Sequence, residues 1–141
     1  MTTPTETTRS VILERVFPHP PEKIWRALTD KSLIAEWLMK NDFAPAVGQK
    51  FQFRADPVAG WDGIIHCKVL IVDPEKQLSY TWRTLGLNSA VHFTLTPTSS
   101  GTHLRMEHSG FRPDHEAAIK GATFGWKKFL GNLEQLTERM D

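Results

Sequence analysis

The sequence predicts an α+β protein that combines an antiparallel sheet with a long C-terminal helix. A first strand-like segment, 10–17, is followed by others at 50–54, 61–73, 77–84, 88–97 and 102–110. The last four are joined by connections of hairpin length. Two short helical patterns stand between the first and second strands, and one long amphipathic pattern ends the chain. This grouping is typical of a sheet with its helices on one face.

Proline and aspartate mark the starts of the two short helices. Pro20 and Pro21 suit the first turn of a helix at 19–30, in which Ile24 and Leu28 share an apolar face. Asp30 is a good N-cap for a second helix immediately after it. The sequence therefore predicts two consecutive helices in this region.

Length and composition fit an ordinary globular domain. The chain has 141 residues, a net charge of +1 and one cysteine, Cys67. We expect residues 1–9 to form a disordered tail and residues 10–141 to form a single domain. The near-neutral charge gives no reason to expect nucleic acid or a membrane as partner, and the lone cysteine favours a reducing, cytoplasmic location.

Alternation along the strands divides the sheet into an inner and an outer face. The first strand, 10–17, carries apolar residues on both faces and stays ambiguous. The residues of the other strands that we expect to face inward are Phe51, Phe53, Trp61, Ile65, Cys67, Val69, Ile71, Leu78, Tyr80, Trp82, Val91, Phe93, Leu95, Leu104, Met106 and His108.

The C-terminal helix, expected from about residue 114 to 139, has an apolar stripe that changes along its length. From Phe129 onward the stripe is bulky, whereas before Trp126 it consists of alanine and glycine. Gly121 and Gly125 could leave space above the sheet for a ligand, or could let the helix pack closely against its neighbours. Gly131 lies on the polar side, and neither idea explains it. Phe124 is either a lid over the cavity or part of a self-association patch.

Two inward polar residues, Tyr80 and His108, could orient a ligand or act as an acid–base pair. The alternative is that each is a buried polar group with its hydrogen bonds satisfied inside the core. Asp62, next to Gly63, is either a turn residue or a polar contact at the cavity mouth. Cys67 is expected to be a small buried hydrophobic residue and no nucleophile.

The outer face carries histidines, but their pattern does not favour a metal. His66, His92 and His103, together with Arg105 and Glu107, lack the spacing of a ligand set and are better interpreted as a solvated surface. No phosphate-binding glycine loop, dinucleotide fingerprint or Ser–His–Asp order is present. We therefore expect no metal and no cofactor.

Three segments carry a resemblance to a known family. They are ERVFPHPPEKIWRALTDKSLIAEWL, VDPEKQLSYTW and FGWKKFLGNLEQL. In this order they closely resemble the START-like superfamily, in the branch related to the activator of the 90-kDa heat-shock protein ATPase, over residues 10–138. The resemblance implies a helix-grip fold, with a curved six-stranded antiparallel sheet around the C-terminal helix and a cavity between them. It also implies that Trp25 and Trp37 belong to helices that close the cavity mouth.

The leading functional hypothesis is a non-enzymatic binding module for a hydrophobic, aromatic small molecule. The residues predicted to line its cavity are Trp37, Phe53, Trp61, Tyr80, Trp82, Met106, His108, Phe111 and Trp126. A second hypothesis is an enzyme similar to polyketide cyclases and dehydratases, and a third is a co-chaperone with an interaction surface around His92, Arg105 and Glu107. Formation of a homodimer and contact with a chaperone are left open.

Overall fold

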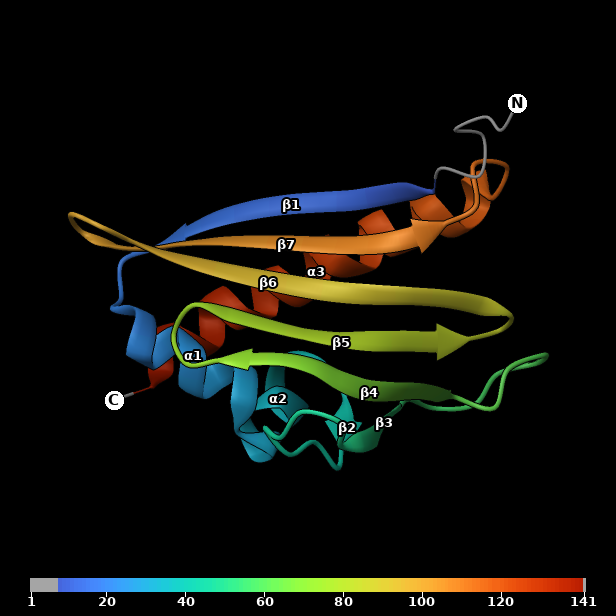
Figure 1. Cartoon of the computed structure of the whole chain (residues 1–141), viewed down its shortest axis with the longest axis horizontal. Helices are drawn as coiled ribbons and strands as arrows, with labels where there is room; N and C mark the ends of the chain where they lie inside the picture. The colour runs from blue at the N-terminus through green and yellow to red at the C-terminus, as the bar shows by residue number, and fades with distance from the viewer. Residues whose placement is uncertain (1–7, 141) are drawn as a thin grey trace.

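The computed structural model describes residues 8–140 and confirms an α+β fold of the helix-grip kind (Figure 1). In chain order its elements are β1 (Arg9–Phe17), α1 (Pro21–Thr29), α2 (Lys31–Trp37), β2 (Lys40–Asn41), β3 (Lys50–Arg54), β4 (Ile64–Asp73), β5 (Gln77–Thr84), β6 (Leu87–Thr98), β7 (Gly101–Phe111) and α3 (Glu116–Arg139). Arg9 is the first residue of β1, and residues 1–7 of the expected tail lie outside the described part of the chain.

The strands form one antiparallel sheet in the order β1-β7-β6-β5-β4-β3-β2. The sheet therefore has seven strands where the sequence predicted six. The additional strand, β2, is only two residues long and pairs with Phe53 and Arg54. A segment this short shows no alternation, so a pattern of period two cannot detect it.

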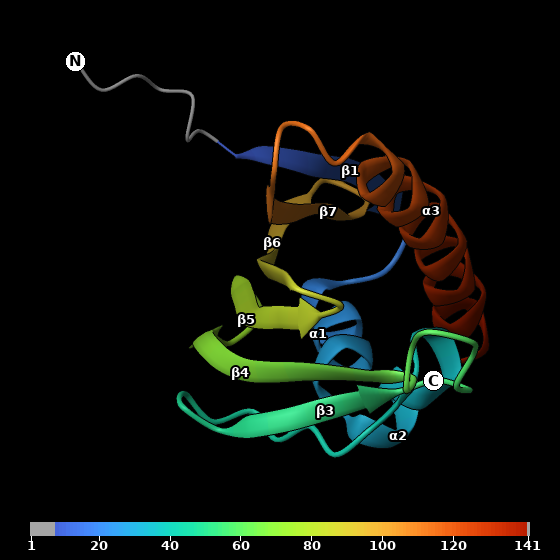
Figure 2. The same ribbon diagram turned by 90° about the vertical axis from the view of Figure 1, so that its right-hand side faces the viewer.

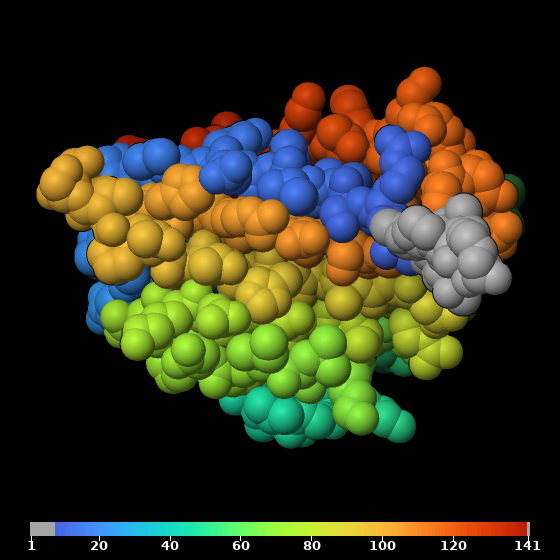
Figure 3. Space-filling model, turned by 45° about the horizontal axis from the view of Figure 1, so that its top comes forward, coloured from blue at the N-terminus to red at the C-terminus, as the bar shows by residue number. Residues whose placement is uncertain are grey.

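The sheet curves so that all three helices lie on its inner side. Figure 2 shows α3 on one side of the curve, with α1 and α2 between α3 and the strands β3 and β4. The opposite face of the sheet is a surface of strand side chains, which Figure 3 shows from β1 across to β3. The apolar core lies between the inner face and the helices.

Alternation predicted the inner face correctly for β3, β5, β6 and β7. The inward residues are buried because every second side chain of a strand points to the same face. They are Phe51, Phe53, Leu78, Tyr80, Trp82, Val91, Phe93, Leu95, Leu104, Met106 and His108. In β1, the residues that face inward are Val11 and Phe17, with Leu13 packed against the core.

In β4 the prediction is wrong at both ends. The strand begins at Ile64, so Trp61 precedes it. An irregularity in the pairing with β5, between Val69 and Ile71, then shifts the register by one residue. Such a bulge reverses the side-chain alternation that follows it. Ile71 is consequently exposed, and Val72 packs against the core instead.

The two short helices begin as the sequence predicts. Pro20 is the N-cap residue of α1. At the start of α2, the Asp30 carboxylate accepts hydrogen bonds from the backbone N–H groups of Ser32 (2.9 Å) and Leu33 (3.2 Å), which satisfies donors that a helix start leaves free. The Ser32 hydroxyl also donates to Asp30, and these bonds lower the pKa of the carboxyl below its ordinary value.

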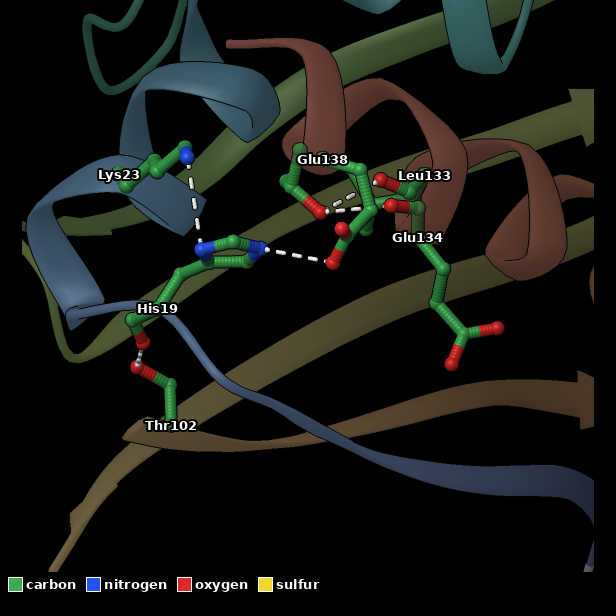
Figure 4. Close-up of polar contacts among 7 residues, drawn as sticks. His19, Lys23, Thr102, Leu133, Glu134 and Glu138 are labelled. Carbon is green, nitrogen blue, oxygen red and sulfur yellow. Dashed lines mark hydrogen bonds and ion pairs between the residues drawn. The ribbon is translucent and has the colours of Figure 1, made fainter. Parts of the chain in front are cut away.

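The C-terminal half of α3 is firmly anchored. Its buried residues are Leu130, Leu133, Leu136 and Thr137. Glu138 approaches the ring of His19 at 3.3 Å, and Lys23 of α1 approaches the other ring nitrogen at 3.4 Å (Figure 4). The His19 carbonyl accepts a hydrogen bond of 2.7 Å from the hydroxyl of Thr102 in β7. This end of α3 is thus tied to α1 and, through His19, to the sheet.

The N-terminal half of α3 is held by few contacts. Between Glu116 and Gly125, only Ile119 is buried, and the next buried residue is Trp126. The surface ion pair between Glu116 and Arg9 of β1 (2.7 Å) adds little stability because both groups are exposed. The C-terminal half of the helix is therefore packed in the core, whereas the buried residues of the N-terminal half are Ile119 and Trp126.

Among the described residues, no helix has both the length and the apolar character needed to cross a membrane.

Candidate functional site

The inner face carries a group of aromatic side chains under the middle of α3. Trp82 of β5 lies at its centre, with ring-centroid distances of 5.4 Å to Phe53, His108 and Trp126. The Phe111 ring packs against the His108 ring at a centroid distance of 4.7 Å, with the two planes tilted by 59°. These rings come from β3, β5, β7 and α3, so the group joins the sheet to the helix.

A chain of hydrogen bonds crosses this apolar group. The Trp126 indole N–H donates to Nδ1 of His108 at 3.0 Å, and Nε2 of His108 lies 2.8 Å from the Ser89 hydroxyl. The Ser89 hydroxyl in turn donates to the Trp82 carbonyl at 2.7 Å. The chain therefore runs from α3 through β7 to β6 and β5.

The donors in this chain of hydrogen bonds determine the protonation state of His108. An indole nitrogen can only donate, so Nδ1 of His108 must be the unprotonated acceptor. The Ser89 hydroxyl donates its one proton to the Trp82 carbonyl. Nε2 of His108 must therefore carry the ring proton and donate to the Ser89 oxygen. His108 is therefore a neutral imidazole with both nitrogens satisfied.

Burial keeps His108 in this neutral state. The side chain is 2% exposed, and loss of hydration lowers its pKa to about 4. Protonation would also place an N–H on Nδ1 opposite the N–H of Trp126. The geometry therefore supports the interpretation of His108 as a buried polar group whose hydrogen bonds are satisfied inside the core.

Tyr80 belongs to a second aromatic group. Its ring contacts Phe43, Phe51 and Phe53 at centroid distances of 6.2, 5.2 and 5.8 Å. Tyr80 pairs with Val91 of β6, and Val91 pairs with His108 of β7. Two strand spacings, roughly 10 Å, therefore separate Tyr80 from His108. The structure does not bring the predicted acid–base pair together, and burial raises the pKa of the Tyr80 hydroxyl well above its ordinary value.

The structure buries eight of the nine predicted cavity residues in the core. They are Trp37, Phe53, Tyr80, Trp82, Met106, His108, Phe111 and Trp126. Trp37 also joins the two short helices, because its indole N–H donates to the Ala27 carbonyl at 2.8 Å.

Trp61, the ninth predicted cavity residue, packs against the edge of the core and is not fully buried. It is half-buried in the segment that precedes β4. Its indole N–H donates to the Thr84 hydroxyl at 2.8 Å. It lines a surface hollow with Ile64 and Leu85. Asp62 accepts a hydrogen bond from the Ile64 N–H at 3.0 Å, which agrees with the interpretation as a turn residue.

Comparison with known proteins gives the family of this fold. Residues 18–138 match the model of the family described as "Activator of Hsp90 ATPase homolog 1-like protein". The chain belongs to this family. The resemblance to the START-like superfamily, in the branch related to that activator, is thereby confirmed.

Solved structures of similar proteins share the fold of this chain over most of its length. Protein MLL2253 from Mesorhizobium loti is 56% identical, with a TM-score of 0.88 over 94% of this chain and 99% of that one. Protein BH1534 from Bacillus halodurans is 26% identical, with a TM-score of 0.80 over 92% and 96% of the two chains. CalU16 from Micromonospora echinospora, 24% identical with a TM-score of 0.79 over 97% and 81%, shows the fold alone. Comparison with curated proteins gives no match.

The sequence pattern did not identify two of the residues in the interior of the fold, Ser89 and Phe43. Ser89, which completes the hydrogen-bond chain, has the same strand parity as Val91 and Phe93. Extending the alternation by two residues would have found it. Phe43 precedes β3 in an irregular segment, so no periodic signal marks it.

The glycines of α3 do not serve close packing. A Cβ atom added to Gly121 or Gly131 would meet no atom within 4 Å beyond its own helical surroundings, and one at Gly125 would meet only a Phe129 ring carbon at 3.9 Å. The close-packing alternative for Gly121 and Gly125 is therefore wrong. Phe124 is 76% exposed and does not contact the interior, so it is not a cavity lid.

Proposed function

We propose that this protein binds a hydrophobic, aromatic small molecule between the sheet and the N-terminal half of α3. The observation that carries the proposal is the contrast between the two halves of α3. The half above the aromatic group around Trp82 has only Ile119 and Trp126 as buried anchors. Outward movement of that half exposes the rings while the C-terminal half keeps the fold together.

Small side chains line the flank of α3 along which a ligand would pass. At about 100° per residue, Ala118, Gly121, Ala122 and Gly125 lie on the same side of the helix. Further along, this side carries Asn132, whose amide approaches the Trp37 carbonyl of α2 at 3.4 Å. Beyond the end of α2, a Cβ atom at Gly121 would meet no atom within 4 Å and one at Gly125 would meet only a Phe129 ring carbon at 3.9 Å, which leaves room for a ring to enter.

The hydrogen-bond chain supports a preference for ligands with one polar donor. When Trp126 moves away with α3, Nδ1 of His108 loses its donor while Nε2 stays bonded to Ser89. A buried acceptor without a partner is costly, so a ligand hydroxyl or N–H is favoured in that position. The surrounding rings of Trp82 and Phe111 supply the apolar contact area.

The acid–base alternative has less support. A general base works best when its pKa is near the working pH, whereas burial lowers the pKa of His108 to about 4. Tyr80, the second group that the reaction would need, lies two strands away. Binding without catalysis is therefore the function that we propose.

The test uses 2-naphthol, an aromatic molecule with one hydroxyl donor, and isothermal titration calorimetry. We expect 2-naphthol to bind, and 2-methoxynaphthalene to bind roughly fivefold more weakly, because it cannot donate to His108. The substitution Gly125→Leu should weaken binding roughly tenfold or more by filling the entry flank. Gly131→Leu is the matched control, since it places the same side chain in the same helix on a side about 120° away from the flank.

Circular dichroism and thermal melting establish that both leucine variants are folded. Equal affinity of Gly125→Leu and Gly131→Leu for 2-naphthol would contradict the proposed entry flank. A wild-type protein that binds neither naphthalene derivative would overturn the proposed function.

A further inference from the structure

The outer face of the sheet carries a second hollow, separate from the interior. It has a volume of about 950 Å³ and lies over β3, β4, β5 and the start of β6. No helix covers this face of the sheet (Figure 1). The basic residues of the hollow are Lys50, Arg54, Lys68 and Arg83, together with His66. Asp42 is its one acidic residue. We call this set of residues the cationic groove.

The lysines and arginines of the cationic groove form no ion pair within the described part of the chain. The ion pairs among residues 8–140 involve other side chains, and none includes Lys50, Arg54, Lys68 or Arg83. Arg54 donates to the Gln52 side chain and Arg83 to Asn88, both of which are uncharged.

Like charges face one another across the strands of the groove. Lys50 of β3 pairs directly with Lys68 of β4. Like charges in directly opposed positions destabilise a sheet. An anionic partner over this pair would convert a repulsion into an attraction.

A smaller hollow continues the cationic groove at one end. It has a volume of about 340 Å³ and shares His66, Thr84 and Leu85 with the groove. It adds Gly60, Asp62 and the large apolar side chains of Trp61 and Ile64. Leu85 is 71% exposed at the tip of the β5–β6 hairpin. The occupant of the two hollows should therefore combine negative charge with a large apolar side chain.

The backbone at Leu85 strengthens this inference. Leu85 and Gly86 form a two-residue hairpin loop with φ angles of 50° and 76°. This turn suits asparagine or glycine in its first position, because a leucine in the left-handed region is strained. Leu85 is thus an exposed apolar side chain on a strained backbone, beside Trp61.

We propose that the cationic groove binds an extended acidic peptide segment of a partner protein, with an apolar side chain of the segment held by Trp61, Ile64 and Leu85. Alternate side chains of an extended peptide are roughly 7 Å apart, the same repeat as that of Lys50, Gln52 and Arg54 along β3. The cations span three strands, which is too wide for one small anion. Among the lining residues of the groove the exposed ring is that of His66, whereas binding of single-stranded nucleic acid relies on several rings on which successive bases stack.

The experiment measures fluorescence anisotropy of a short fluorescein-labelled peptide with glutamate at every second position and phenylalanine at both ends. We expect saturable binding that weakens with added salt. The double substitution Lys50→Glu and Lys68→Glu should weaken binding roughly tenfold or more. Lys127→Glu with Lys128→Glu is the matched control, since it changes the net charge equally on the exposed side of α3.

A second variant separates binding from folding. Leu85→Asn should raise the melting temperature, because asparagine suits this turn, and yet lower peptide affinity by severalfold because the apolar contact is lost. Equal peptide affinity in the Lys50/Lys68 and Lys127/Lys128 variants would overturn the proposal. Tighter binding of an oligothymidylate than of the peptide, dependent on Lys50 and Lys68, would overturn the assignment to a peptide. None of these measurements depends on the interior ligand site.

Discussion

His108 shows how one side chain can be polar and still belong to a hydrophobic core. Its two ring nitrogens meet one obligatory donor, Trp126, and one hydroxyl whose proton is already used, Ser89. This arrangement suits the neutral ring and opposes the imidazolium. The residue therefore links the acidity of the solution to the stability of the contact between α3 and the sheet.

The first prediction concerns this link. In the unfolded chain His108 has an ordinary pKa near 6.5, whereas in the folded protein the pKa is about 4. The unfolded state thus binds more protons between these values, and the stabilising contribution is complete above pH 6.5 and falls as the pH falls toward 4. We expect the free energy of unfolding to drop by about 2 kcal/mol between pH 7.5 and pH 5 from this residue. Urea unfolding at several pH values measures it.

Two variants isolate the contribution of His108. His108→Gln should lower stability overall but flatten the dependence on pH, because the titrating group is gone. His115→Gln, at an exposed position, should keep the wild-type dependence. The same slope in His108→Gln as in the wild type would show that another group is responsible.

At the scale of the element, α3 is a helix whose two halves have different roles. Its C-terminal half carries leucines and contacts β1 through Glu134 and α2 through Asn132 and Arg139, whereas its N-terminal half carries alanine and glycine. The change of side-chain size at Trp126 was visible in the sequence. What the sequence could not decide was whether the glycines permit close packing, because that depends on which atoms lie opposite them in space.

The second prediction concerns Gly121 and Gly131. A Cβ at either position meets open space, so Gly121→Ala and Gly131→Ala should each raise the free energy of unfolding by about 0.5–1 kcal/mol through better helix propensity. Urea unfolding checks this. Gly110→Ala is the contrasting control, since its φ is 105° and the added carbon would lie 2.9 Å from the Asn88 carbonyl oxygen. A loss of stability in the first two variants would mean that α3 has a close neighbour on those sides.

The strands show the same division between what a pattern can and cannot predict. Alternation identified the inner residues of β5, β6 and β7, because side chains in a regular strand point to the two faces in turn. It failed in β4 after Val69, where the register with β5 shifts and Ile71 becomes exposed. It also placed Trp61 in a strand that begins only at Ile64. Bulges and strand ends depend on the partner strand, which is not encoded in a local pattern.

At the scale of the whole molecule, the sheet and the C-terminal half of α3 form a frame around an aromatic interior. The frame is anchored by contacts such as Glu138 with His19, whereas the N-terminal half of α3 depends on Ile119 and Trp126. The fold class and most of the interior residues could be predicted from the sequence. The hydrogen-bond chain through Ser89, the separation of Tyr80 from His108, and the position of Trp61 required the three-dimensional structure.

In the proposed binding mode, the N-terminal half of α3 opens locally and an aromatic ligand binds beneath it. Native-state amide hydrogen exchange with and without 2-naphthol tests this binding mode most directly. We predict that amides 120–126 exchange faster than amides 130–137, and that saturating 2-naphthol slows exchange in the first group. Equal protection in both halves, unchanged by 2-naphthol, would contradict this binding mode.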